Sequence, residues 1–279
     1  MASDSKSSSS VSSDSVSSDE ESAAETDIVP APKLPITSEC KHYVDRSEVP
    51  WDIQKYFDQR FSIFSRYRDG IRLTDEAWYG VTPEPVANAI ALRTSCIHKD
   101  KSILIDAFAG AGGNTIAFAL SGHWQRIFAI ERDAATLACA QHNASVYGVD
   151  QSIITWIQAD SFHFLDAVAA CYSGLDPDLR IYDGSAVVFA SPPWGGPGYR
   201  TDKIFNLETM QPYSISRLHS AYGGLDHMLH LPRTSDLGQI ANLAPEATKI
   251  EVTQYCLNGA SKGMVAYFPG DKSRLPILQ

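Results

Sequence analysis

The sequence predicts an α/β fold built on one largely parallel sheet. Short apolar runs that suit buried strands alternate with helix-like segments over residues 103–268. The first run, 103–106, leads through a glycine-rich turn at 107–114 into a helix at 115–120. An acid or an unusual loop follows each of the first four runs. Because the carboxyl ends of parallel strands meet at one edge of a sheet, a ligand site is expected there.

Seven strand-like segments share a short length and an apolar or β-branched composition. They are 103–106, 127–130, 153–157, 186–190 and 228–232, with a closing antiparallel pair at 250–257 and 263–268. Helices are expected at 115–120, 134–147 and 236–243, and Asp133 and Gly148 suit the two ends of the second. The spacing predicts a Rossmann-like seven-stranded sheet with a reversed last strand and helices on both faces.

The amino-terminal part of the chain differs in composition from this core. Residues 1–27 are mostly Ser, Asp and Glu with few large apolar side chains, so they bury too little surface to order themselves. A proline-rich stretch follows and suits a stiff linker. We therefore expect a disordered tail and linker over 1–40, a helical extension over 41–94 and the catalytic core over 95–279.

Two helices are expected in the extension. Apolar residues at three- and four-residue spacing predict an amphipathic helix from Ile53 to near Gly70. Its opposite face is rich in lysine and arginine and is the best candidate for phosphate contact. Thr82, as an N-cap before Pro83, predicts the start of a second helix that runs to about Arg93.

Charge and cysteine content exclude several classes of protein. Residues 1–27 hold seven acids and one base, which accounts for most of the net charge of −10, so the remainder is only mildly acidic. A generally basic nucleic-acid binder is excluded, and any RNA contact has to be local. Five scattered cysteines without a Cys-x-x-Cys pair argue against structural zinc or a disulfide framework. With no 18-residue apolar run, we expect a soluble intracellular protein without metal or membrane contact.

Acids at strand ends suit a nucleoside cofactor. The turn after Asp106 brings glycine backbone and a helix N-terminus to the ligand edge. Glu131, at the end of the second strand, can accept hydrogen bonds from both hydroxyls of a ribose. Asp160, after the third strand, can accept one from an adenine amine.

The loop after the fourth strand is the most unusual stretch, with the sequence Ser-Pro-Pro-Trp-Gly-Gly-Pro-Gly-Tyr at 191–199. Its two prolines remove backbone donors and leave the carbonyls of Ser191 and Pro192 free to accept hydrogen bonds from a planar NH2 group. Trp194, followed by small residues, offers an open indole face on which a flat, preferably cationic, ring can stack.

The Asp106 to Thr115 segment, Glu131 and the 191–199 loop together resemble the catalytic domain of the trimethylguanosine synthases, which are RNA cap hypermethylases. The similarity covers roughly residues 51–268. It implies a class I S-adenosylmethionine-dependent methyltransferase that methylates guanine N2 on N7-methylguanosine caps of small nuclear and nucleolar RNAs, giving 2,2,7-trimethylguanosine. It also implies a nuclear or nucleolar location and ribonucleoprotein proteins that deliver the RNA. We expect a monomer.

The resemblance also implies roles for individual residues. The catalytic set is Ser191, Pro192 and Trp194. The cofactor set is Phe64, Thr82, Asp106, Phe108, Gly110, Asn114, Glu131, Asp160 and Ser191. The substrate set, for the guanine and the cap triphosphate, is Lys55, Trp194, Tyr199, Arg233 and Lys262. The chain departs from the family where Gly198 replaces a common Asp and Gly80 replaces an expected Ser beneath the guanine ring.

The chemistry of the cap agrees with these roles. N7 methylation makes guanine cationic, and a cation over an indole gains about 0.5–2 kcal/mol. The N2 lone pair is delocalised into the ring, so in-line transfer needs alignment more than a strong base, and no covalent enzyme intermediate is expected.

Two alternatives remain open on the sequence. An adenine-N6 amino methyltransferase of RNA or DNA also presents an exocyclic amine on a Pro-Pro-aromatic loop, although Ser191 and Trp194 disfavour it. A cap-binding platform that has lost catalysis is the second, and the retained Asp106 and Glu131 argue against it.

Overall fold

A single sheet organises the computed structural model, which describes residues 27–170, 173–181, 184–196, 202–245 and 248–271. Its strands are β1 (Ile103–Asp106), β2 (Arg126–Ile130), β3 (Ile154–Ile157), β4 (Ala186–Ala190), β5 (Asp226–Leu231), β6 (Glu251–Leu257) and β7 (Ala260–Phe268). The spatial order is β3-β2-β1-β4-β5-β7-β6. Strands β1 to β5 pair in parallel, whereas β7 pairs antiparallel with both β5 and β6. The predicted seven-stranded sheet with a reversed last strand is confirmed.

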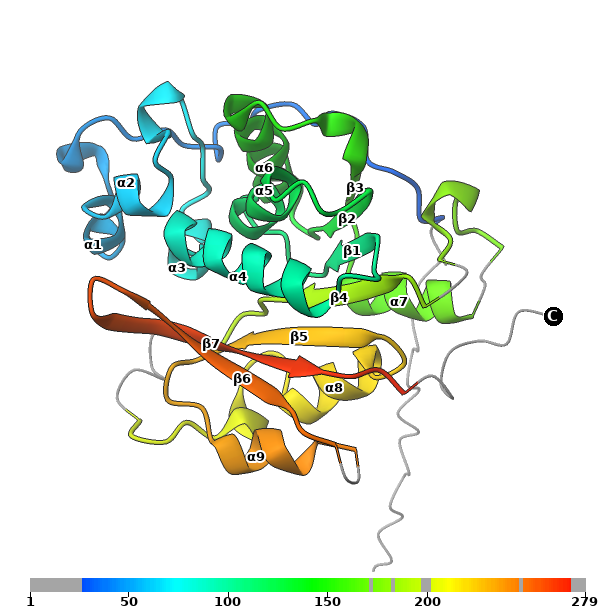
Figure 1. Cartoon of the computed structure of the whole chain (residues 1–279). Helices are drawn as coiled ribbons and strands as arrows, with labels where there is room; N and C mark the ends of the chain where they lie inside the picture. The colour runs from blue at the N-terminus through cyan, green and yellow to red at the C-terminus, as the bar shows by residue number, and fades with distance from the viewer. Residues whose placement is uncertain (1–26, 171–172, 182–183, 197–201, 246–247, 272–279) are drawn as a thin grey trace, which may run out of the picture.

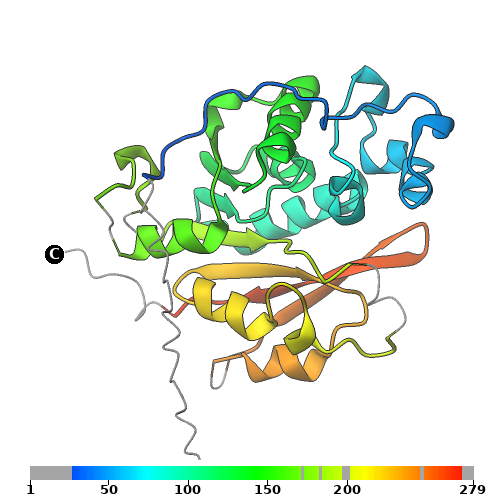
Figure 2. The same cartoon turned by 180° about the vertical axis from the view of Figure 1, so that it is seen from behind.

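Alternate strand residues point into two hydrophobic cores, one on each face of the sheet. Leu104 and Val187 join the core under α4 (Glu84–Ile97), α5 (Gly113–Leu120) and α6 (Ala134–Tyr147). Ile105 and Val188 join the other core, under α7 (Ser161–Ala169), α8 (Ile215–Tyr222) and α9 (Leu237–Asn242). Burial on both faces explains why these strands are continuous apolar runs. Figures 1 and 2 show the two faces in turn.

The expected helices of the core are present, with one difference at α4. Asp133 caps α6 by accepting from the Thr136 N–H, and Gly148 ends it in the left-handed conformation. Helix α4, however, has Pro83 at its N-cap position and runs to Ile97. Thr82 does not cap it, because the Thr82 hydroxyl instead accepts a hydrogen bond from the Asn114 amide at 3.1 Å. Helices α7 and α8 were not anticipated from the sequence.

The extension does not contain the single long helix expected from Ile53 to near Gly70. It forms two one-turn helices, α1 (Gln54–Phe57) and α2 (Arg60–Ile63), followed later by α3 (Ala77–Gly80). The breaks let Phe57, Tyr67 and Trp78 pack on one another, with ring centroids about 6 Å apart. Apolar spacing of three and four residues is satisfied by this aromatic cluster as well as by a continuous helix, which is why the periodicity misled.

The extension packs onto the core without a break. The Asn143 side chain of α6 accepts from the Arg72 N–H and donates to the Arg72 carbonyl, both at 2.8 Å. The expected boundary at residue 94 falls inside α4. The linker also lies against the core, since Ala31 N–H donates to the Trp156 carbonyl at 2.7 Å. The tail expected to be disordered spans 1–27, and its residues 1–26 lie outside the described residues.

Within the ranges that the structure describes, none of the helices has the length and apolar character needed to span a bilayer.

Candidate active site

A large cleft opens beside the carboxyl ends of the parallel strands. Its volume is about 1380 Å³. Its walls are the segments after β1 to β5, the β6–β7 hairpin and the α1 and α3 regions of the extension. A single small-molecule site usually occupies about 300–1,000 Å³, so this cleft has room for two ligands side by side.

One part, which we call the cofactor half, is formed by residues after β1, β2 and β3 together with Tyr213. Its members are Phe108, Gly110, Asn114, Glu131, Asp160 and Tyr213. Glu131 lies at its centre, where one carboxylate oxygen accepts from the Gly110 N–H at 3.1 Å and the other from the Asp133 N–H at 2.9 Å. Burial raises the pKa of Glu131, and these two backbone donors oppose the rise. Each oxygen keeps a lone pair for a further donor.

The glycine turn between β1 and α5 is built for close approach. Gly112 has a φ of +90°, and a Cβ there would lie 3.2 Å from the Ala140 Cα. A Cβ on Gly113 would press on the Thr82 carbonyl at 3.4 Å. Asn114, the second residue of α5, lies beside them and donates to the Thr82 hydroxyl through its amide nitrogen. These contacts fix the turn between α6 and the extension, with Gly110 open to the cleft.

Asp106 lies behind this turn and does not line the cleft. It is fully buried, and its carboxylate accepts from the Thr115 hydroxyl at 2.6 Å. Burial raises the pKa of Asp106 to about 7, although the Thr115 hydrogen bond opposes the shift. Asp106 can therefore act on a ligand through its charge and through the turn, rather than through surface contact.

Asp160 has two structural partners in addition to any ligand. One carboxylate oxygen accepts from the Phe162 and His163 N–H groups and caps α7. The other is 3.4 Å from the Tyr213 hydroxyl, which donates to it. The Tyr213 ring also lies 5.9 Å from that of Phe108. Tyr213 was not predicted as a site residue, because it follows β4 by 23 positions and no motif surrounds it.

The groups of the cofactor half fit S-adenosylmethionine. Glu131 offers free lone pairs to ribose hydroxyls. The Asn114 side-chain oxygen is buried and has no hydrogen-bond partner among the described residues, so it can accept from the ammonium of a bound amino acid. Phe108 and Tyr213 offer aromatic surface beside Asp160 for an adenine.

The other part, which we call the substrate half, is centred on Ser191, Pro192, Trp194 and His230. The indole N–H of Trp194 donates to the His230 carbonyl at 3.1 Å, and the Ser191 hydroxyl is 3.2 Å from His230 Nδ1. His230 was not predicted as a site residue, although a histidine inside an apolar strand was a signal. Gly195 turns the chain away with a φ of +86°.

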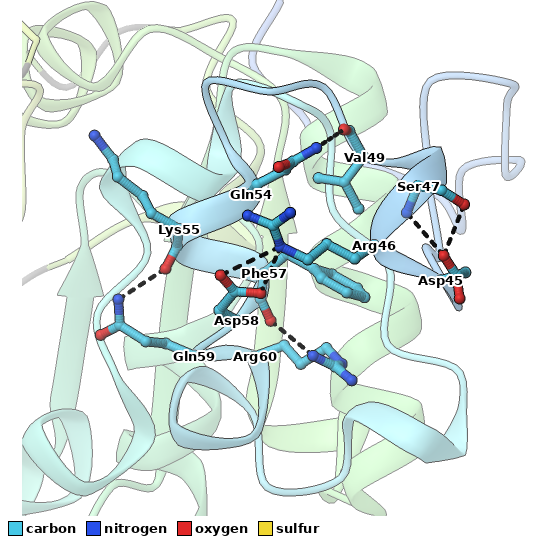
Figure 3. A network of polar contacts seen from close by, with 10 residues as sticks. All are labelled: Asp45, Arg46, Ser47, Val49, Gln54, Lys55, Phe57, Asp58, Gln59 and Arg60. Atoms are coloured by element: carbon cyan, nitrogen blue, oxygen red, sulfur yellow. Dashed lines mark hydrogen bonds and ion pairs between the residues drawn. The ribbon is translucent and has the colours of Figure 1, made fainter.

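Three cations stand around this half on separate segments. Lys55 comes from α1, Arg233 follows β5, and Lys262 lies on β7 near the hairpin turn, and all three line the cleft. Figure 3 shows the Lys55 side chain extending away from the polar network around Arg46 and Asp58. The Lys55 carbonyl accepts from the Gln59 amide at 2.9 Å, and the Lys55 ammonium lies 4.9 Å from the centroid of the Tyr56 ring.

Like Asp106, Phe64 was expected at the site and does not line the cleft. Phe64 is 2% exposed and packs against Tyr147 behind Gly113, in a small neighbouring pocket. Its expected contact with the cofactor came from the family resemblance alone. Tyr199 lies outside the described residues. Among the described side chains, no cluster of three or more His, Cys, Asp or Glu residues could hold a metal ion.

The fold and the cleft together define the class of protein. A sheet of this order, with an acid and a glycine turn at its carboxyl edge, is that of a class I S-adenosylmethionine-dependent methyltransferase. The fold is similar to the crystal structure of a protein from Porphyromonas gingivalis W83 described as a methyltransferase. The TM-score is 0.52 at 14% identity, over 80% of this chain and 51% of that one, so the likeness concerns the fold alone.

Sequence comparison gives the family. Residues 101–271 match the family of RNA cap guanine-N2 methyltransferases. The trimethylguanosine synthase of Schizosaccharomyces pombe is 35% identical over 79% of this chain and 87% of its own length. That of Saccharomyces cerevisiae is 32% identical over 75% of this chain, which spans 65% of that relative. The chain belongs to the RNA cap guanine-N2 methyltransferases, uses S-adenosylmethionine and acts on capped RNA.

Proposed function

We propose that this protein methylates the N2 amine of N7-methylguanosine at RNA caps and carries it to 2,2,7-trimethylguanosine. The observation that carries the proposal is one cleft that joins Glu131 and the glycine turn to Ser191, Pro192 and Trp194. Both relatives described above are named trimethylguanosine synthases, which supports addition of two methyl groups. We further propose small nuclear and nucleolar RNAs as substrates, a location in the nucleus or nucleolus, delivery by ribonucleoprotein proteins and action as a monomer.

Trp194 is proposed to stack on the cap guanine. Its indole lines the cleft, and the hydrogen bond from its N–H to the His230 carbonyl holds the ring plane. A cationic N7-methylguanine gains about 0.5–2 kcal/mol from the indole face that neutral guanine lacks. This difference corresponds to roughly 2- to 30-fold in affinity and accounts for a requirement for prior N7 methylation.

Ser191 and Pro192 are proposed to orient the amine. Bound S-adenosylmethionine supplies an electrophilic methyl group. The Ser191 hydroxyl and the Pro192 carbonyl can accept the two N–H groups of the amine, which turns its lone pair toward the cofactor half. The amine gains one methyl and releases one proton in each round, so a second round requires the remaining N–H to be held in the same way.

Three of the cations that line the cleft suit the cap triphosphate. Lys55, Arg233 and Lys262 come from three separate segments, so they can surround a flexible chain of phosphates. Tyr199 is proposed to assist them. The weak overall charge of the core makes this local cluster the main electrostatic attraction for RNA.

The experiment offers N7-methylguanosine triphosphate and unmethylated GTP side by side with labelled S-adenosylmethionine, and identifies the products by mass spectrometry. We expect one or two added methyl groups on the N7-methylated nucleotide only. Equal methylation of both nucleotides would remove the stacking argument for Trp194. Methylation of adenine in RNA or DNA, with neither nucleotide used, would replace the proposed substrate, and no transfer to any of them would favour a cap-binding platform.

A further inference from the structure

His230 occupies an unusual place between the two principal residues of the substrate half. It is the last residue but one of β5 and is 4% exposed. Its Nδ1 is 3.2 Å from the Ser191 hydroxyl, and its backbone carbonyl accepts the Trp194 indole N–H at 3.1 Å. The imidazole also meets the indole edge to face, with centroids 5.4 Å apart and an interplanar angle of 82°. One residue therefore contacts both groups that are proposed to hold the guanine.

The register of the sheet creates this arrangement. Parallel pairing of β4 with β5 ends at Ala190 and Leu229. Ser191 and His230 come directly after these two residues, so they remain neighbours where the pairing of β4 with β5 ends. After Ser191 the loop turns away from β5. The carbonyl of His230 therefore accepts from the indole N–H of Trp194 instead of from a backbone N–H.

The imidazole is held rigidly from its other side. A Cβ placed on Gly263 of β7 would lie 2.5 Å from His230 Nε2, so β7 packs directly on the ring. Within the described part of the chain, Nε2 has no hydrogen-bond partner. Burial lowers the pKa of His230 to about 4, which keeps the ring neutral near pH 7. Among the described residues, Ser191 is therefore the one hydrogen-bond partner of this ring.

The hydrogen bond suits Ser191 to its proposed task in either tautomer of the ring. If Nδ1 carries the proton, it uses one lone pair of the hydroxyl oxygen and leaves the other. If the serine donates instead, both lone pairs remain. In each case the rotation of the hydroxyl is restricted, and at least one lone pair can accept an amine N–H.

We propose that His230 is a positioning residue for methyl transfer, which orients the Ser191 hydroxyl toward the substrate amine and fixes the plane of the Trp194 indole. This inference rests on the proposed function, because the amine is the group that Ser191 would hold. His230 need not touch the substrate, and its imidazole acts through Ser191. Gly263 belongs to the same device, since it leaves the space in which the ring is clamped.

The test compares variants by kcat and KM on N7-methylguanosine triphosphate and by calorimetric affinity for S-adenosylmethionine. His230→Leu keeps the side-chain volume and the backbone carbonyl but loses Nδ1. We expect its kcat to fall about tenfold to a hundredfold with cofactor affinity unchanged. His230→Asn, whose amide nitrogen can occupy the Nδ1 position, should recover most of that loss. Gly263→Ala, which displaces an unaltered ring, should lower kcat in the same way.

A double-mutant cycle with Ser191→Ala separates positioning from a structural effect. In the Ser191→Ala background, His230→Leu should cause no further loss of kcat, because the residue it orients is gone. His227→Leu is the matched control, a buried histidine on the same strand that bonds to the Leu225 carbonyl instead. It should leave kcat near that of the wild type.

The outcomes distinguish this inference from the function on which it rests. If the wild type is active, three results would overturn the role of His230 and leave the function intact. They are an unchanged kcat in His230→Leu, additive losses of kcat in the double-mutant cycle, and no recovery of kcat in His230→Asn. Wild-type protein that methylates neither nucleotide would overturn both.

Discussion

The two halves of the cleft are built in opposite ways. The cofactor half is fixed by the sheet and the turns that follow its strands. Both carboxylate oxygens of Glu131 accept hydrogen bonds from backbone N–H groups, and Asp106 is fully buried behind the glycine turn. The substrate half is assembled from a loop, a strand end and a hairpin, with Lys55 added from the extension. Changes in the first half should therefore affect folding and cofactor binding together, whereas changes in the second should affect catalysis with the fold intact.

Trp194→Ala is expected to have the largest effect. Loss of stacking on the indole, worth about 1–3 kcal/mol per base, should lower kcat/KM for the N7-methylated cap by about a hundredfold. Calorimetry should show S-adenosylmethionine affinity within about twofold of wild type. Trp194→Phe, which keeps a ring but loses the hydrogen bond to His230, is the control. Its kcat/KM should lie between those of the wild type and Trp194→Ala. A similar loss of cofactor affinity in Trp194→Ala would show that the two halves of the cleft do not act independently.

Asp106→Asn should act on the cofactor half first. The buried carboxylate attracts a cationic ligand through the glycine turn, and an amide of the same size lacks that charge. We expect S-adenosylmethionine affinity to fall about tenfold, with KM for the cap nucleotide little changed at saturating cofactor. Titration calorimetry at pH 7.5 measures the first quantity. Unchanged affinity would remove Asp106 from the cofactor site.

The same substitution carries a pH prediction. Burial raises the pKa of Asp106 to about 7, so between about pH 4 and 7 the folded protein retains a proton that the unfolded chain has released. This contribution to stability is present at low pH and is lost as the pH rises through 7. Melting temperatures without cofactor should fall more steeply from pH 5 to 7.5 in wild type than in Asp106→Asn, by on the order of 5 °C. Parallel slopes would contradict the raised pKa.

Tyr213→Phe tests one hydrogen bond at the edge of the cofactor half. It removes the hydroxyl that donates to Asp160 but keeps the ring beside Phe108. Because the substitution removes one neutral hydrogen-bond donor to a carboxylate in a partly exposed site, cofactor affinity should fall about three- to tenfold. Phe162→Leu, which alters the ring that packs at a tilt against Tyr213, is the control for packing. A gain of affinity in Tyr213→Phe would mean that its hydroxyl competes with the ligand for Asp160.

Gly80→Ser should have the smallest effect. Gly80 lines the cleft at the end of α3, its φ is not positive, and a Cβ there meets nothing within 4 Å. The substitution should fold normally and lower KM for the cap nucleotide by no more than about threefold, through one added hydroxyl. Steady-state kinetics with both nucleotides measures it. A large fall in kcat would show that the open space at Gly80 is itself required.

Much of the sheet and of the cofactor half could be predicted from the sequence because each depends on short, local patterns. Gly110 follows one apolar run and Glu131 ends the next, so the parallel pairing of β1 with β2 is enough to bring them together. His230 and Tyr213 could not be assigned, because their partners come from other strands and loops. Phe64 was expected at the site from the family resemblance alone, and the structure places it in the core behind the glycine turn.

The hairpin of β6 and β7 has a consequence for how the protein folds. Strand β7 follows β6 in the chain but lies between β5 and β6 in the sheet, so β6 cannot join the sheet when it is synthesised. Strand β6 can therefore join the sheet only through β7, whereas β1, β2 and β3 precede β5 in the chain and can pair as soon as they are made. Because the hairpin carries Lys262 and clamps His230 through Gly263, we expect the nascent chain to acquire its cofactor site first and its substrate site last.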